Sequence, residues 1–288
     1  MSSSDSPQFE PQSLVSVEPQ PSIPTAPHPF ASASFPPVAV PAPVVKDPVW
    51  NGWDVLLIAL LTIFTLIVVE LLTVVVAHAL IYPQTSFADV AQKPALVILG
   101  EFLAYIAVAA YMVMLVQGKY HQPFWKAIRW NWPRNAALML LLGVFTVSLD
   151  LLSKYLPMPK TTPFDQFFAR PSDAYLMVAF AVTFGPLMEE LFFRGFLYPV
   201  LERWAGEIPA ILLTALPFGM IHYLQYKSWA AVLVITLVGV VLTAVRAVTK
   251  SVAASFLVHV GYNGTLMTLA ALATDGFRHM EKAAAGMW

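Results

Sequence analysis

Apolar residues fill several stretches of about twenty residues or more along this chain, with few charges inside them. A helix rises 1.5 Å per residue, so about 20 apolar residues cross the roughly 30 Å hydrocarbon core of a membrane. The pattern predicts an all-α, polytopic membrane protein with about seven transmembrane helices, within a range of six to eight. The predicted spans are residues 55–82, 94–117, 136–152, 174–200, 208–226, 229–245 and 252–273.

Basic and aromatic residues gather in the loop between the second and third predicted spans. Lys119, Lys126, Arg129 and Arg134 stand there beside three tryptophans. Basic loops stay on the cytoplasmic side of a membrane, and tryptophans are enriched at its interfaces. The loop therefore predicts an integral, multi-pass protein whose N-terminus is cytoplasmic. The tryptophans, interpreted as an aromatic belt, are Trp125, Trp130 and Trp132.

A proline- and serine-rich segment precedes the first span. Residues 1–48 hold twelve of the chain's 24 prolines and only one basic residue, Lys46. This composition buries too little apolar surface to offset the entropy of ordering, and it lacks the basic start and apolar stretch of a signal peptide. We expect a disordered tail. The rest divides into residues 49–168 with the first three spans and the basic loop, residues 169–274 with the later spans, and a short C-terminal tail, residues 275–288.

Two smaller features shape the later spans. Residues 163–168, with the sequence PFDQFF, predict a helix at the membrane interface. Pro217 lies inside the fifth span and is expected to kink it, because a proline removes one backbone hydrogen bond.

The overall composition supports the membrane assignment and excludes other classes. Hydrophobic residues make up 58% of the chain and charged residues only 11%, whereas soluble domains carry about 25% charged residues. The net charge of −1 and the lack of a basic block give no reason to expect nucleic acid as a partner. The expected partner is membrane lipid. The absence of cysteine excludes disulfides, thiolate metal sites and a cysteine nucleophile. The oligomeric state is left open.

Several ionisable side chains lie inside the predicted spans, where each costs about 2.5–3.5 kcal/mol on insertion scales. Each therefore calls for a partner, an aqueous cavity or a chemical role. The set is Glu70, His78, Glu101, Asp150, Glu189, Glu190, Arg194, His222 and His259, with the amide of Asn263 beside them.

The sequence GPLMEELFFRG in the fourth span contains the first of three polar motifs. Glu190 and Arg194 are four residues apart, so they share a helical face and lie within ion-pairing reach. Glu189 then points about 100° away from this pair. Because a buried ion pair needs only one carboxylate, the second glutamate is free for chemistry.

The two later motifs repeat the four-residue spacing. Phe218 and His222 share a face of the fifth span, and His259 and Asn263 share a face of the seventh. Together with Glu189 these side chains can line one buried, water-filled pocket. From the helical rise, His222 and His259 differ by about 10 Å in their depth in the membrane. The two imidazoles can meet only if the fifth helix is tilted or the span boundaries are shifted by a few residues.

Such a pocket supports two kinds of chemistry. A carboxylate beside an imidazole can hold and deprotonate a water, while a second imidazole and an amide N–H stabilise an oxyanion. Alternatively, Glu189, His222 and His259 supply one carboxylate and two imidazoles, which is an acceptable Zn²⁺ ligand set with room for a water. The sequence leaves both alternatives open.

The three motifs, in the order EExxxR, FxxxH and HxxxN on late hydrophobic spans, resemble those of the CPBP intramembrane proteases. That family includes the type II CAAX prenyl endopeptidases and the bacterial Abi-type, bacteriocin-processing relatives. The resemblance covers about residues 170–270, so residues 169–274 are expected to form the catalytic core. The first three spans resemble the family only in being hydrophobic. Each motif alone is weak, but three in order are specific.

The resemblance implies an endopeptidase that cleaves a membrane-associated, CAAX-like protein or peptide. It implies that Glu189 activates the water with help from His222, and that His259 and Asn263 form the oxyanion hole. Both a metal-dependent and a metal-free, glutamate-based mechanism fit the family. The supporting residues are Glu190, Arg194 and Phe218.

Two other functions remain as alternatives. One is a proton-coupled transporter, although no internal repeat supports it. Its relay would consist of Glu70, Glu101, Asp150 and the region of Glu189 and His222. The other is a non-proteolytic membrane scaffold of the same fold. In the protease hypothesis the three acidic residues outside the motifs either line the aqueous cavity or bind backbone and histidine groups such as His78.

Overall fold

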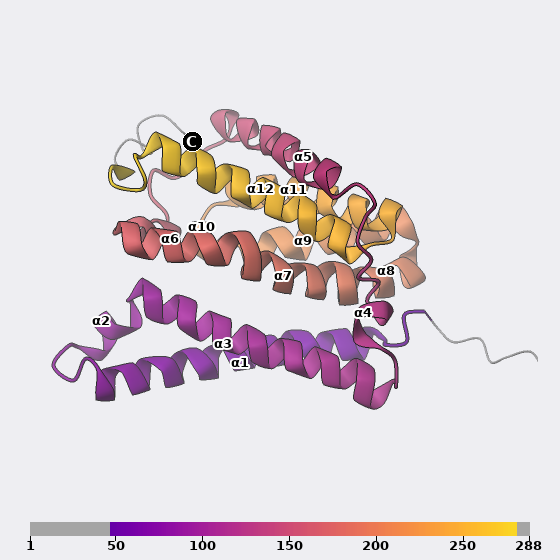
Figure 1. The fold of residues 1–288 in the computed structure, drawn as a ribbon, viewed down its shortest axis with the longest axis horizontal. Coiled ribbons are helices and arrows are strands. Elements are labelled where there is room, and N and C mark those ends of the chain that lie inside the picture. Colours follow the sequence, from indigo (N-terminus) through magenta and orange to yellow (C-terminus); the bar gives the residue numbers. More distant parts are fainter. Residues whose placement is uncertain (1–46, 281–288) are drawn as a thin grey trace, which may run out of the picture. The chain divides into compact units, whose positions relative to one another are not determined.

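A computed structural model describes residues 47–280 of the chain, and these residues contain helices and no strand (Figure 1). Seven helices in this range are long and apolar enough to cross a membrane. The all-α prediction with about seven spans is confirmed. The predicted disorder of residues 1–48 falls almost entirely outside the described residues, as does most of the predicted C-terminal tail. These seven candidate spans are Gly52–Leu80, Pro94–Lys119, Ala136–Tyr155, Pro171–Ala205, Glu207–Tyr226, Trp229–Thr249 and Val252–Ala273.

The first three spans differ in regularity. Helix α1 is unbroken, α3 ends in a π-helical turn η1, and α5 changes into a 3-10 helix η2. The third span therefore continues three residues beyond its predicted end at residue 152. The elements are α1 (Gly52–Leu80), α2 (Phe87–Ala91), α3 (Pro94–Met114), η1 (Leu115–Lys119), α4 (Phe124–Ala127), α5 (Ala136–Thr146) and η2 (Val147–Tyr155).

The fourth span is the least regular, because two π-helical segments interrupt it. The short helix predicted at residues 163–168 is present as the 3-10 helix η3, and Pro217 lies within α9. The elements are η3 (Pro163–Phe168), α6 (Pro171–Ala179), η4 (Phe180–Phe184), α7 (Gly185–Glu190), η5 (Leu191–Leu197), α8 (Tyr198–Ala205), α9 (Glu207–Ile221), α10 (Tyr223–Tyr226), α11 (Trp229–Thr249) and α12 (Val252–Ala273).

Side-chain caps fix where the long helices begin. The Asn51 side chain accepts hydrogen bonds from the backbone N–H groups of Trp53 and Asp54, and the Asp54 carboxylate accepts one from the Asn51 N–H. Asp54 also binds Lys119 Nζ at 2.6 Å, which ties the start of α1 to the end of the α3 span. Ser228 and Ser251 cap α11 and α12 in the same manner, since each hydroxyl accepts from the backbone three residues later. Such caps stabilise a helix end by about 1 kcal/mol each.

The surface of the bundle is apolar where a soluble protein would be polar. Along α1, large side chains such as Leu60, Phe64 and Ile67 are exposed, whereas Glu190 and Arg194 are completely buried. Exposed apolar faces of this extent suit contact with lipid. Together with the seven long helices, they indicate an integral, multi-pass membrane protein, while the cytoplasmic placement of the N-terminus stays a prediction.

Close helix pairs hold the bundle together, with α1 beside α3, α5 beside α12 and α9 beside α11 (Figure 1). Small residues allow the closest approach, between α5 and α12. A Cβ atom at Gly143 would lie 2.2 Å from the Val258 carbonyl oxygen, and one at Gly261 would lie 2.4 Å from the Leu140 carbonyl oxygen. Only glycine fits at these two crossing points, because the neighbouring atoms belong to backbone.

We predict that Gly143→Ala destabilises the protein by about 1–3 kcal/mol, because the added methyl group forces α5 and α12 apart. Alanine favours a helix by about 1 kcal/mol over glycine, so the backbone clash must exceed this gain. Thermal unfolding of the detergent-solubilised protein measures the change. Gly118→Ala is the matched control, since nothing lies within 4 Å of its Cβ position. Equal unfolding midpoints for the two variants would contradict the prediction.

Candidate active site

The first polar motif lies on the short helix α7, between the two π-helical segments η4 and η5. Glu189 and Glu190 are the last two residues of α7, and Arg194 lies in the middle of η5. Segments with π-helical bonding are rare and occur frequently at functional sites. The local irregularity therefore coincides with the residues that the sequence singled out.

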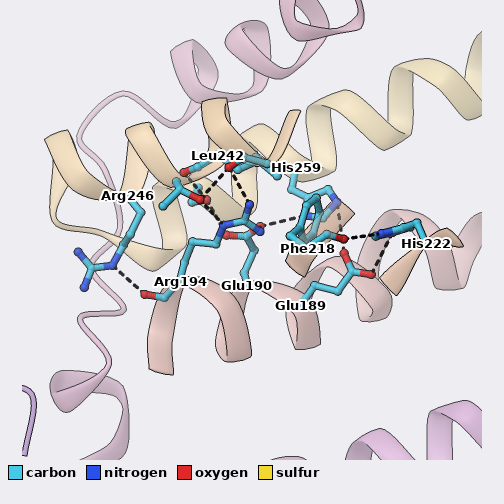
Figure 2. A network of polar contacts seen from close by, with 11 residues as sticks. Glu189, Glu190, Arg194, Phe218, His222, Leu242, Arg246 and His259 are labelled. Carbon is cyan, nitrogen blue, oxygen red and sulfur yellow. Dashed lines mark hydrogen bonds and ion pairs between the residues drawn. The ribbon is translucent and has the colours of Figure 1, made fainter. Parts of the chain in front are cut away.

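Glu190 is fully buried, and three polar side chains contact its carboxylate (Figure 2). Its Oε1 atom accepts a hydrogen bond from Arg194 Nη1 at 2.9 Å and faces His259 Nδ1 at 3.0 Å. Its Oε2 atom accepts from the Ser255 hydroxyl at 2.5 Å. Both carboxylate oxygens are thus occupied, and Glu190 joins α7, η5 and α12. The predicted ion pair between Glu190 and Arg194 is present.

Arg194 is also completely buried and uses its donors on helix α11. Its Nε donates to Thr243 Oγ1 at 3.2 Å, and its Nη2 donates to the Gly239 carbonyl at 3.0 Å. The guanidinium lies 4.3 Å from the centre of the Phe218 ring, a cation–π contact that is worth more when water is absent. Phe218 therefore covers the arginine, and it also meets the ring of His222 edge-on.

Glu189 points away from this network toward two imidazoles (Figure 2). Its Oε1 lies 3.8 Å from His222 Nε2, and its Oε2 lies 3.7 Å from His259 Nε2. The Glu189 and His222 side chains keep 19% and 16% of their surface accessible. Distances of this size are too long for direct hydrogen bonds and suit a bridging water. The depth difference expected between the two imidazoles is closed, because both reach the same carboxylate.

The second nitrogen of each imidazole has a fixed acceptor. His222 Nδ1 lies 2.8 Å from the Phe218 carbonyl oxygen, and His259 Nδ1 lies 3.0 Å from Glu190 Oε1. Carbonyl and carboxylate oxygens only accept, so Nδ1 carries the proton in both rings. A neutral ring then turns the lone pair of Nε2 toward Glu189. This assignment follows from the acceptors: a neutral ring can accept a water proton at Nε2, and a ring protonated on both nitrogens donates from Nε2 instead.

Asn263 is not brought to the Glu189 carboxylate. Its Nδ2 donates to the carbonyl of Ala181 in η4 at 2.7 Å. The share in an oxyanion hole that the family resemblance implies for Asn263 stays a prediction.

The donor set of Glu189, His222 and His259 suits Zn²⁺ in its chemistry, since each imidazole presents Nε2 and holds Nδ1 on a second acceptor. In its arrangement, however, the set does not fit: within the described residues, no group of three or more His, Asp or Glu side chains is placed to hold a metal ion. We therefore derive the reaction from the side chains alone, and zinc binding stays a prediction that metal analysis tests.

Residues outside the motifs also approach the site. Glu101 of α3 acts electrostatically on Glu189, and the hydroxyl of Tyr105 lies within hydrogen-bonding reach of Glu101. Tyr105 stacks on Phe180 of η4 at 6.0 Å between ring centres. Helix α3 thus packs beside the π segment η4 that precedes the site, and the carboxylate of Glu70 acts electrostatically on Glu101 in turn.

The remaining acidic and histidine candidates have local partners. Asp150 Oδ1 accepts from the Tyr262 hydroxyl at 3.1 Å, and His78 Nδ1 faces the carbonyl of Tyr82 at 3.2 Å. Asp150 and His78 therefore do not contact each other, and a role of the acidic residues in lining an aqueous cavity stays a prediction. Sequence reasoning also missed Ser255, although its position four residues before His259 places it on the same helical face.

Comparison with known proteins points to the segment that carries the three motifs. A family model described as type II CAAX prenyl endopeptidase Rce1-like matches residues 171–265, which begin at α6 and end within α12. The match contains all three motifs and confirms the resemblance to the CPBP/CAAX protease family, and it supports a hydrolase of the protease class. It covers about a third of the chain. No curated protein and no solved structure matches the chain.

We predict that Arg194→Met destabilises the protein by about 3–5 kcal/mol, because it leaves the Glu190 carboxylate buried without its countercharge. The double variant Glu190→Gln, Arg194→Met should regain most of this loss, since it removes both charges together. Thermal unfolding in detergent compares the three proteins. Arg134→Met, a change at an exposed arginine, is the control and should leave the unfolding midpoint unchanged. A double variant that is less stable than Arg194→Met would contradict this account of the pair.

Proposed function

We propose that this protein is an intramembrane endopeptidase that hydrolyses a peptide bond of a membrane-associated protein or peptide. The observation that carries the proposal is the position of Glu189, whose two carboxylate oxygens face the Nε2 atoms of His222 and His259 at 3.8 and 3.7 Å. A water in this space meets a base and two imidazoles at once. The match to a protease family model supports the reaction class.

In the first step, Glu189 and His222 activate the water. His222 Nε2 accepts a hydrogen bond from one water hydrogen, and Glu189 takes the other proton as the water oxygen bonds to the carbonyl carbon. The carbonyl π electrons move to its oxygen, which becomes the oxyanion of a tetrahedral intermediate. Because Nδ1 of His222 is held by the Phe218 carbonyl, the ring stays oriented during this step.

In the second step, His259 stabilises the oxyanion and the intermediate collapses. His259 enters the reaction protonated on both nitrogens, with its Nδ1–H held by Glu190; it donates a hydrogen bond from Nε2 to the oxyanion and keeps both protons throughout. When the C–N bond breaks, the departing amine nitrogen takes the proton that Glu189 carries. Glu189 returns to its carboxylate form and the new carboxyl terminus leaves.

The substrate class follows from the family model only by analogy. A CAAX-like, prenylated C-terminal peptide is the first candidate, and a bacteriocin-type precursor peptide of the Abi-type relatives is the second. A membrane-embedded site favours substrates that are anchored in, or close to, the bilayer.

We predict that Glu189→Gln, His222→Ala and His259→Ala each lower peptide hydrolysis by at least about 100-fold, the range expected for loss of a general acid or base. The assay uses prenylated and unprenylated CAAX peptides with the purified protein. Glu207→Gln and His121→Ala, at exposed positions, serve as controls and should retain activity. Full activity in any of the three site variants would contradict the assigned roles.

Metal analysis of the same preparations separates the two mechanisms. Stoichiometric zinc, chelator-sensitive hydrolysis and loss of zinc in Glu189→Gln would establish a metalloprotease with these three ligands. Hydrolysis by metal-free protein, still lost in the three variants, would establish the glutamate-based reaction derived above.

The electrostatic contact between Glu70 and Glu101 favours a second candidate, a proton-coupled transporter. In that case Glu70→Gln should abolish proton-driven solute flux in proteoliposomes. Normal peptide hydrolysis in Glu70→Gln, with no flux in either protein, would exclude this candidate.

A further inference from the structure

Two prolines stand at equivalent places around the catalytic helix. Pro186 is the second residue after the π segment η4, and Pro199 is the second residue after the π segment η5. Each follows a residue whose backbone N–H bonds five residues back: Gly185 donates to the Phe180 carbonyl, and Tyr198 donates to the Phe193 carbonyl. Both segments therefore end in the same backbone pattern.

Each proline leaves one carbonyl without its main-chain donor. After Gly185 and Tyr198, the next N–H in the π series would belong to residue 186 or 199, and proline has none. The carbonyls that lose this donor lie five residues earlier, at Ala181 and Arg194. An unsatisfied carbonyl inside the hydrocarbon region is costly, because no bulk water replaces the missing donor.

Side chains of two later helices fill both positions. Asn263 of α12 donates from Nδ2 to the Ala181 carbonyl at 2.7 Å, and Arg246 of α11 donates from Nε to the Arg194 carbonyl at 3.2 Å. Arg246 is only 1% exposed, and this is its single hydrogen bond within the part of the chain that the structure describes. Figure 2 shows this bond on the far side of Arg194 from Glu190.

We propose that Asn263 and Arg246 are positioning residues that hold the π-helical register on either side of the catalytic glutamates by capping the carbonyls of Ala181 and Arg194. The capping follows from the two side-chain hydrogen bonds and the two prolines, and only its effect on catalysis rests on the proposed protease function. It gives Asn263 a role that differs from a donor in the oxyanion hole.

The register decides where the catalytic side chains point. A π turn holds one residue more than an α turn, so a return to α-helical bonding rotates everything beyond it by about 100°. A change in η4 would turn Glu189 away from His222 and His259. A change in η5 would move Arg194 relative to Glu190, and Glu190 fixes His259.

The test restores the missing backbone donor at each proline. We expect Asn263→Leu and Arg246→Met each to lower kcat by about 10- to 100-fold with little change in KM, the rate equivalent of one unsatisfied buried carbonyl. Pro186→Ala supplies an N–H to the Ala181 carbonyl, so it should rescue Asn263→Leu to within about threefold of Pro186→Ala alone. Pro199→Ala should rescue Arg246→Met in the same manner.

The crossed pairs are the matched controls. Pro199→Ala should not rescue Asn263→Leu, and Pro186→Ala should not rescue Arg246→Met, because each alanine donates to its own carbonyl only. If each proline substitution restored the activity of both variants alike, the effect would be a general stabilisation, and the proposal would be overturned. Failure of both matched pairs would also overturn it, and failure of the Asn263 pair alone would assign Asn263 to the oxyanion.

Thermal unfolding in detergent provides a second readout that needs no substrate. The midpoints should fall in Asn263→Leu and Arg246→Met and recover only in the matched double variants. If the wild-type protein hydrolyses no peptide, the protease function fails, while the pattern of midpoints still decides whether the side chains cap the two carbonyls. Midpoints that do not recover in the matched pairs would count against the caps.

Discussion

The arrangement of this site depends on one ion pair, Glu190 with Arg194, which is completely enclosed in a protein that spans the membrane. Burying two charges costs several kcal/mol per ion unless every lone pair and proton finds a partner. Here the partners come from three directions: Ser255 and His259 on α12, Thr243 and the Gly239 carbonyl on α11, and the ring of Phe218 on α9. The need to satisfy this pair therefore brings four separate spans to one point.

The same requirement separates the two adjacent glutamates. Both oxygens of Glu190 are hydrogen-bonded, so Glu190 cannot take part in proton transfer without disrupting the network. Glu189 is one residue away, turned by about 100°, and its two oxygens face imidazole nitrogens at distances longer than a direct hydrogen bond. His259 connects the two, because its Nδ1 binds the structural carboxylate and its Nε2 faces the reactive one. Helix α7 thus provides both a structural carboxylate, Glu190, and the proposed base, Glu189.

Much of this was predictable, because the constraints act on the sequence directly. A span must be about 20 apolar residues long, so the seven spans could be placed to within a few residues. Ionisable residues in hydrocarbon need partners, so helical spacing could pair Glu190 with Arg194 and His259 with Asn263. That the separate spans meet at Glu189 was only an expectation, because spacing within one helix does not fix how helices pack. The π segments could not be predicted in this way, because Pro186 and Pro199 are equally compatible with a kink. What selects the π register is the presence of Asn263 and Arg246, which lie 77 and 47 residues further along the chain. The structure of residues 1–46 lies outside the described part, so the expected tail is untested.

The dependence on distant donors has a consequence for how the site forms. In water, an irregular helix would satisfy its free carbonyls with solvent, and its shape would be a local property. In a membrane the Ala181 and Arg194 carbonyls need side chains from α12 and α11, and the charge of Arg194 needs the α11 backbone. The geometry of α7 is therefore complete only when the last two spans have packed against it. Until then Glu189 has no imidazole from α12 and no fixed direction, so the reactive arrangement is a property of the finished bundle.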